Sequence, residues 1–356
     1  MSISDIRCHQ TRLPLNHPLR NATVEITGFT ILLVDVVDEN GLCGEGIAFT
    51  IDPRQMPAVV SSVELFRDAF LGSDPNDVTG TYEKCLRRLG FLGMSGAPIH
   101  ALSAIEGAVW DLRGKRTGSS IASLLGRSRT AVPVYASQGL WTNQDTPDLV
   151  RQAATFVDAG YRGMKLRLTN DLSADIPRIA AIRRQIGDDI QLMVDANQGM
   201  SYRQALRFVE HAAEFDLEWF EEPFRPHEIG ALRDLRSKSA IPIASGESDY
   251  TRFGCQKLLD EHAVDILMPD LQRVGGVSDF IAVCAASAAN AVPISSHLFP
   301  EMSLQIMAHA RCVHSLEMVD WFSPLFSEQI ELDEGYATVP SRPGWGFTVN
   351  RSLFDI

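Results

Sequence analysis

The chain has 356 residues, of which 45% are hydrophobic and 22% are charged, a composition typical of a folded globular protein and not of a disordered or fibrous chain. This length allows a barrel-sized domain with an appended module. The formal net charge of −13 excludes nucleic acid as an expected partner, whereas a bound cation can reverse the potential inside one pocket and admit a small anionic substrate.

The cysteine pattern and the first residues bear on the compartment. Six cysteines are scattered without a CxxC pair, so we expect buried thiols in a reducing cytoplasm and neither a zinc knuckle nor a disulfide framework. The N-terminal residues lack the apolar run of a signal peptide, and no stretch of about 18 apolar residues occurs. The sequence therefore predicts a soluble cytoplasmic protein that makes no contact with membranes.

The first 125 residues have the pattern of a β-then-α module. Residues 28–48 predict a β-hairpin, with turn chemistry supplied by Glu39-Asn40-Gly41. From about Pro57 to Leu125 the pattern is helical, and apolar residues within Ala97–Lys115 recur at spacings of three and four. We expect residues 1–125 to form a separate α+β domain.

After Gly126, short β-branched runs alternate with amphipathic helices, which is typical of βα units around a parallel sheet. In one unit Gly187 ends a helix, and in the next Ser201 can cap one. Eight strands are predicted, at residues 132–135, 163–168, 190–194, 217–220, 241–244, 264–268, 292–294 and 313–316. We expect residues 126–322 to form an α/β barrel with its reactive groups at the C-terminal strand ends. Residues 323–356 lack this rhythm and should pack back on the N-terminal module.

Three acids close consecutive apolar strands. Asp195, Glu221 and Glu247 lie 26 residues apart, the period of one βα unit, so the three carboxylates should converge at one rim of the barrel. They would repel one another without a cation, and hard oxygen ligands suit Mg²⁺ or Mn²⁺ with positions left for water and substrate. Each acid alone could instead cap the following helix, and spacing does not separate Glu221 from Glu222.

A pair of cations lies on the second predicted strand. Strand alternation points Lys165 and Arg167 to the same face, toward the barrel interior. Buried cations require anions, which the metal-binding carboxylates and an acidic substrate would supply. The alternative is a pair of strand residues that only bridge ions.

Acid and base groups close three later strands. Asp270 and His297 lie 27 residues apart, so the carboxylate can orient the imidazole, whose ordinary pKa of about 6.5 suits proton transfer near neutrality. A purely structural histidine is the alternative. Glu317 closes the eighth strand and could donate a proton to an enolate if its pKa is raised, or bind a helix end.

Together these motifs resemble the mandelate racemase branch of the enolase superfamily, the mandelate racemase / muconate lactonizing enzyme family, over nearly the whole chain. The resemblance is carried by the segments Gly163-Met-Lys165-Leu-Arg167, Val194-Asp195-Ala-Asn197, Phe220-Glu221-Glu222-Pro223, Gly246-Glu247-Ser248, Pro269-Asp270, Ser295-Ser-His297 and Leu316-Glu317. It implies a modified TIM barrel, (β/α)7β, with an α+β capping domain formed by the N-terminal region and the C-terminal tail. It also implies Mg²⁺ held by Asp195, Glu221 and Glu247, and a homo-oligomer.

The resemblance further implies abstraction of the α-proton of a carboxylate substrate through an enolate, with Asp270 and His297 as the base on one face and Glu317 stabilising charge. The family often has a second lysine as the opposing base, where this chain has Arg167, a poor base. This departure favours a one-base reaction, the dehydration of an acid sugar or related hydroxy acid to a 2-keto acid, with Lys165 and Arg167 binding substrate.

Two alternatives stay open. A racemase or epimerase of a hydroxy acid or amino acid derivative would use Lys165 or Arg167 opposite His297. A non-catalytic metal-binding scaffold is the third hypothesis. Substrate specificity is expected to come from loops near residues 15–27 and 88–98, where Arg20 and His17 are either substrate contacts or solvated side chains.

Overall fold

The N-terminal part is an antiparallel sheet with helices on one side, seen in the computed structural model, which describes residues 2–355. The sheet has the order β1 (Ile3–Arg20), β2 (Glu25–Asp38) and β3 (Cys43–Thr50). The predicted hairpin is confirmed as β2–β3, whereas β1 was not predicted as a separate strand. The helices of this part are α1 (Met56–Val63), α2 (Arg67–Phe70), α3 (Val78–Arg88) and α4 (Ala97–Thr117), with the 3₁₀ turn η1 (Pro53–Gln55).

Helix α4 packs directly on β3 because β3 carries glycines at the contact. A Cβ atom at Gly44 or Gly46 would overlap the carbonyl oxygens of Ala108 and Ala104 in α4. The absence of side chains lets the two backbones approach closely. This contact explains why α4 is buried on most of its surface, including its polar residues Glu106 and Asp111.

After α5 (Ile121–Leu125), eight parallel strands form a closed barrel, since β11 pairs with β4. All eight predicted strands are confirmed, and so is the modified TIM-barrel fold with an N-terminal sheet cap. The strands are β4 (Ala131–Ala136), β5 (Gly163–Arg167), β6 (Gln191–Asp195), β7 (Leu217–Glu221), β8 (Ile243–Ser245), β9 (Ile266–Leu267), β10 (Ile294–Ser295) and β11 (Val313–Met318).

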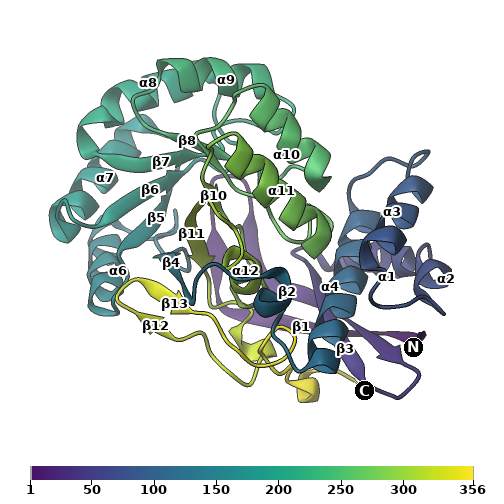
Figure 1. The fold of residues 1–356 in the computed structure, drawn as a ribbon. Helices are drawn as coiled ribbons and strands as arrows, with labels where there is room; N and C mark the ends of the chain where they lie inside the picture. The colour runs from purple at the N-terminus through teal and green to yellow at the C-terminus, as the bar shows by residue number, and fades with distance from the viewer. Residues whose placement is uncertain (1, 356) are drawn as a thin grey trace.

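Helices cover the outside of the barrel, as Figure 1 shows. They are α6 (Thr146–Asp158), α7 (Leu172–Ile186), α8 (Tyr202–Ala212), α9 (Ile229–Lys238), α10 (Thr251–Asp260), α11 (Val277–Ala289) and α12 (Pro300–Met307), with the short turn η2 (Ala213–Phe215). The predicted helix signals hold: Ser201 and Gln204 form a capping box, and Gly187 ends α7 at a φ of 74°.

The barrel interior has its own small core. Six buried residues form a cluster separate from the main one: Tyr135, Met193, Trp219, Ala244, Ile266 and Met268. The Nζ atom of Lys165 lies 5.7 Å from the centre of the Tyr135 ring. The apolar filling of the barrel therefore adjoins the charged residues at its rim.

The C-terminal segment contacts the barrel first and the N-terminal sheet second. The hairpin of β12 (Leu332–Asp333) and β13 (Tyr336–Thr338) pairs antiparallel with β4, which the sequence did not predict. Beyond it, Trp345 Nε1 donates to the Glu45 carbonyl at 2.9 Å. Figure 1 shows this yellow segment returning toward β1–β3. Two 3₁₀ turns, η3 (Ser323–Leu325) and η4 (Arg351–Leu353), complete the segment.

Glu106 of α4 joins the N-terminal part to the barrel. Its carboxylate accepts hydrogen bonds from Trp110 Nε1 at 2.7 Å and from the backbone amides of Val277 at 2.7 Å and Ser278 at 3.0 Å. These amides begin α11, where an anion is favoured by the helix dipole. The cap is thus held against the barrel by a buried carboxyl group that bonds to both parts.

The cysteines are all unpaired. Cys85, Cys255 and Cys284 are buried as expected, whereas Cys8, Cys43 and Cys312 are only partly buried because they lie at sheet edges or in loops. Across residues 2–355, no helix has the length and apolar character needed to cross a membrane.

Candidate active site

The structure brings the three strand-end acids to one rim of the barrel. Asp195 and Glu221 are paired in register as the last residues of β6 and β7. Glu247 follows β8 after Gly246, whose φ of 130° lets the chain turn into the mouth of the barrel. Asp195 is 2% exposed and Glu221 is fully buried, so both carboxylates depend on neighbouring charges for stability.

Lys165 lies between these acids. Its Nζ atom is 2.6 Å from Glu221 Oε1, 3.0 Å from Glu317 Oε1 and 3.6 Å from Asp195 Oδ2. Burial lowers the pKa of Lys165, but the attraction of Glu221 and Glu317 outweighs it and holds the ammonium form. Burial also raises the pKa of Glu221 to about 8, against the effect of Lys165 and with the repulsion of Asp195 and Glu247.

Two hydrogen bonds and a contact with an aromatic ring hold Arg167 in place. Nη1 donates to the Ser137 carbonyl at 3.0 Å and Nη2 to Ser137 Oγ at 2.9 Å. The guanidinium lies 4.4 Å from the centre of the Trp141 ring. The buried Nε–H has no hydrogen-bond partner, and Nε lies 3.8 Å from Asp195 Oδ2. The Nε–H group therefore remains for a ligand.

His297 is held by two carboxylates. Nδ1 lies 2.7 Å from Asp270 Oδ2, and Nε2 lies 3.1 Å from Glu247 Oε2. Burial lowers the pKa of His297, but Glu247 and the hydrogen bond to Asp270 raise it further than burial lowers it. Asp270 therefore orients the ring so that Nε2 faces the strand-end acids.

Glu317 is an anchored carboxylate. It accepts hydrogen bonds from Ser137 Oγ at 2.5 Å and from the Leu298 backbone amide at 2.8 Å. Burial raises its pKa, yet Lys165, His297 and Arg167 together lower the pKa below the ordinary value. This direction favours the ionised form of Glu317, and its hydrogen bond from Leu298 lies just before the start of α12. Proton donation by Glu317 and binding of a helix end stay the two predicted roles.

A cavity of about 100 Å³ opens between these groups and the cap. Its barrel side includes Lys165, Arg167, Asp195, Glu247 and His297. The first loop expected to set specificity is mostly hairpin, because β1 extends to Arg20 and β2 begins at Glu25, but residues 21–26 do contribute to the lining. No residue of 88–98 lines the cavity, and that connection leads into α4, which packs on β3.

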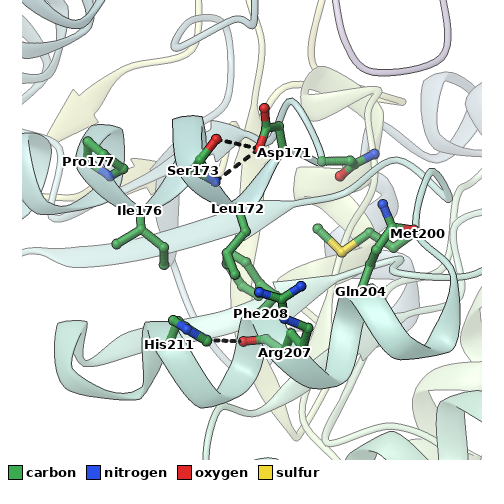
Figure 2. A pocket seen from close by; sticks show the side chains of 11 residues that line it. Asp171, Leu172, Ser173, Ile176, Pro177, Met200, Gln204, Arg207, Phe208 and His211 are labelled. Carbon is green, nitrogen blue, oxygen red and sulfur yellow. Dashed lines mark hydrogen bonds between the residues drawn. The ribbon is translucent and has the colours of Figure 1, made fainter.

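A larger cavity of about 680 Å³ lies elsewhere, between α7 and α8 on the outside of the barrel. Figure 2 shows Leu172 and Ile176 of α7 opposite Phe208 and His211 of α8. It holds none of the strand-end acids, and its size does not make it the reactive centre.

Several neighbouring residues were not predicted. Arg273 Nη1 donates to the Glu247 carbonyl at 2.8 Å, and the Arg273 amide donates to Asp270 Oδ1 at 2.8 Å. Ser137 directly follows β4, so the strand-end rule could have found it. Arg273 follows no strand directly, and no spacing marks it. Glu222 accepts a hydrogen bond from Gln198 Nε2 at 2.6 Å, whereas Glu221 accepts one from Lys165 Nζ at 2.6 Å.

The donor set suits a hard divalent cation. Asp195 and Glu247 both raise the pKa of buried Glu221, and a cation between the three carboxylates would relieve that repulsion. Within residues 2–355, no three His, Cys, Asp or Glu side chains are already grouped around a metal position. Lys165 Nζ and His297 Nε2 instead form the contacts with Glu221 and Glu247. The residues therefore fit Mg²⁺ once these contacts rearrange.

Comparisons with known families agree with the fold and the arrangement of the strand ends. Residues 3–126 match the mandelate racemase / muconate lactonizing enzyme N-terminal domain, and residues 148–353 match the enolase C-terminal domain-like family. The chain belongs to the mandelate racemase / muconate lactonizing enzyme family of the enolase superfamily.

Individual relatives narrow the class further. The chain is 31% identical to the L-talarate/galactarate dehydratase of Salmonella typhimurium, over 95% of this chain and 86% of the relative. That enzyme's structure with Mg and L-lyxarohydroxamate gives a TM-score of 0.94 at 29% identity, covering 99% and 93% of the two chains. The D-galactarolactone cycloisomerase of Agrobacterium fabrum is 30% identical, over 99% of this chain and 97% of that one. A racemase from Streptomyces coelicolor with bound magnesium gives a TM-score of 0.94 at 29% identity, covering 98% of both.

Proposed function

We propose that the protein is a Mg²⁺-dependent dehydratase that converts an acid sugar or related hydroxy acid to a 2-keto acid. The observation that carries this proposal is the single His–Asp pair beside the strand-end acids, with Arg167 and not a second base on β5. The similarity to a named talarate/galactarate dehydratase supports the same reaction class.

Asp195, Glu221 and Glu247 would hold Mg²⁺, which when bound would stabilise negative charge on the substrate carboxylate. Lys165 would remain an ammonium group, because Glu317 is 3.0 Å from Nζ and keeps it charged. Arg167 would donate its unpartnered Nε–H to the substrate. These cations offset the negative charge that develops as the α-proton leaves.

His297 would carry the proton. Nε2 takes the α-proton from C2 while Asp270 accepts a hydrogen bond from Nδ1–H and stabilises the imidazolium. The protonated imidazole then returns that proton to the β-hydroxyl group, the C3–O bond breaks, and water leaves. The resulting enol takes a proton at C3 and releases the proton of its C2 hydroxyl group to give the 2-keto acid, so atoms and charge balance without a second base.

Racemisation is the second candidate, and the likeness to a solved racemase favours it. It requires a base on the face opposite His297. The two hydrogen bonds from Arg167 to Ser137 and its stacking on Trp141 support a binding role over a basic one. Another relative is named a cycloisomerase. The product of cycloisomerisation has the same mass as the substrate, whereas the product of dehydration lacks one water. Product mass therefore separates these two reactions.

The test is a screen of hydroxy acids, acid sugars and their lactones with Mg²⁺, in which 2-keto acid is detected chemically and product mass by mass spectrometry. Keto acid with the loss of one water, abolished by EDTA and restored by Mg²⁺, supports the proposal. Products of unchanged mass would contradict it. Glu247→Gln should weaken Mg²⁺ binding in calorimetry, whereas the exposed Glu210→Gln should not.

We further propose that the enzyme is a cytoplasmic homo-oligomer. Six unpaired cysteines support a reducing compartment. Phe91 and Leu92, at 102% and 68% exposed, place apolar side chains on the surface, as a subunit contact would. Light scattering on the purified protein tests the assembly, and a monomeric mass would contradict it.

A further inference from the structure

The candidate cavity has two chemically different ends. The barrel end carries the charged groups described above. The cap end is formed by six side chains of the N-terminal sheet and the adjoining turns, of which five are apolar: Asn21, Val24, Ile26, Phe29, Phe49 and Ile51. A substrate bound by its carboxylate at the barrel end therefore points its remaining carbons at an apolar wall.

The one polar side chain of the cap end is already engaged. Asn21 Oδ1 accepts hydrogen bonds from the Thr23 amide at 2.8 Å, from Thr23 Oγ1 at 3.1 Å and from the Val24 amide at 2.8 Å. These contacts form the turn between β1 and β2. Asn21 keeps only its amide donors, which is too little to satisfy a chain of hydroxyl groups.

Aromatic rings extend the apolar wall onto the barrel side. Trp321 stacks on Phe29 with ring centres 5.4 Å apart, and Phe29 meets Phe49 at 5.7 Å. Trp141 donates its indole N–H to the Gln138 carbonyl at 3.3 Å, so that donor is engaged by the protein itself. Arg167 lies on the Trp141 ring and marks the boundary between the charged and the apolar ends.

The basic residues of the β1–β2 hairpin add no charge to the lining of the cavity. Arg20 and His17, which the sequence offered as substrate contacts, are exposed and do not line the cavity. A second carboxylate at the cap end would therefore meet no cation from the hairpin. Hydroxyl or carboxylate groups placed against the five apolar side chains would lose water and gain no hydrogen-bond partner from them.

We propose that the substrate is a monocarboxylic 2,3-dihydroxy acid whose carbons beyond C3 are apolar, and not a polyhydroxylated acid sugar or a diacid. This inference rests on the proposed function for the reaction and adds the substrate class. The reaction is the one given above: the α-proton and the C3 hydroxyl leave as the 2-keto acid forms.

Matched five-carbon acids test the proposal. Keto-acid formation is measured with every stereoisomer of 2,3-dihydroxypentanoate and with the pentonates, which differ only by hydroxyl groups at C4 and C5. We expect kcat/KM to be at least about 100-fold higher for the best dihydroxypentanoate, since a hydrophobic pocket discriminates against a single added hydroxyl by about that factor. Equal or higher kcat/KM for a pentonate would overturn the substrate class and leave the dehydratase intact.

Binding separates this inference from the reaction. Calorimetry with Mg²⁺ compares 2,3-dihydroxypentanohydroxamate with 2,3,4,5-tetrahydroxypentanohydroxamate, which differ only at C4 and C5. Tighter binding of the first compound supports the apolar wall even if no keto acid forms. The absence of keto acid would contradict only the proposed dehydratase reaction. Tighter binding of the second overturns the inference. Val24→Thr, which adds a hydroxyl at nearly constant volume, should narrow the binding ratio several-fold, whereas Val60→Thr in α1, outside the cavity, should not.

Discussion

Asp270 holds His297 in one orientation, with Oδ2 lying 2.7 Å from Nδ1, and thereby directs Nε2 toward the acids on the neighbouring strands. Asp270→Asn keeps the size of the side chain but removes the charge that stabilises the imidazolium. We expect kcat for keto-acid formation to fall by about 10²–10⁴-fold, as for other general bases deprived of their orienting carboxylate. Mg²⁺ affinity should change little. The exposed Asp188→Asn is the control, and an unchanged kcat in Asp270→Asn would argue against His297 as the base.

Arg167→Lys tests the departure from the family pattern. Lysine keeps the positive charge but cannot stack flat on Trp141 while donating twice to Ser137. We expect kcat/KM to fall by about 10–100-fold, corresponding to the loss of one or two charge-assisted hydrogen bonds. The measurement is kcat/KM of Arg167→Lys, with the exposed Arg203→Lys as the control variant. Faster α-proton exchange with inversion in Arg167→Lys, at undiminished turnover, would mean that this position works best as a base.

Asp111 should be a stability determinant outside the site. It accepts hydrogen bonds from the backbone amides of Glu45 and Trp345, each at 2.9 Å, and pairs with Lys115 Nζ at 2.7 Å. Asp111→Ala leaves buried donors from β3 and the C-terminal segment unpaired. We expect a loss of about 3–5 kcal/mol in the free energy of unfolding. Urea denaturation measures the free energy of unfolding of Asp111→Ala and of a control variant, the exposed Glu210→Ala. A loss in Asp111→Ala as small as that in the control would refute the anchoring role.

The pH dependence of stability should contain a contribution from Glu106. Burial raises its pKa from 4.5 to about 7 in spite of its hydrogen bonds to Ser278, Val277 and Trp110. The folded state therefore binds this proton more tightly than the unfolded state, so the stabilisation is complete below 4.5 and is lost as pH rises to about 7. The loss amounts to about 3 kcal/mol.

Glu106→Gln resembles the protonated acid and should lack this dependence. The difference in unfolding free energy between wild type and Glu106→Gln should shift in favour of the variant between about pH 5 and about pH 8. Taking the difference removes the contributions of other buried acids such as Glu301. A difference that stays constant across this range would show that Glu106 titrates normally in the folded protein.

The barrel was predictable because its strands are short, apolar and regularly spaced, and because the reactive groups lie on these strands or just after their C-terminal ends. Spacing placed Asp195, Glu221 and Glu247 at one rim; in the structure Asp195 pairs with Glu221, and Asp195 and Glu247 line the same cavity. The hairpin β12–β13 escaped prediction because its strands have two and three residues and gain stability from pairing with β4, a contact that local sequence does not encode.

The neighbours of the site were harder to predict. Arg273 reaches Glu247 from the loop after Asp270, and Trp141 reaches Arg167 from a loop after β4. Both depend on side-chain direction and on loop conformation, which periodicity does not report. The lowered pKa of Glu317 was also not predictable from the sequence, because it depends on how closely Lys165, His297 and Arg167 approach one carboxylate.

The most direct test of the central claim is one incubation with Mg²⁺ and a 2,3-dihydroxy acid substrate in D₂O, followed by NMR of both product and recovered substrate. The account predicts a 2-keto acid that carries one deuterium at C3, no inversion of the recovered substrate, and no reaction in His297→Asn. Recovered substrate with deuterium at C2 and inverted configuration, without keto acid, would contradict the dehydratase and assign a second base to the face of Lys165 and Arg167.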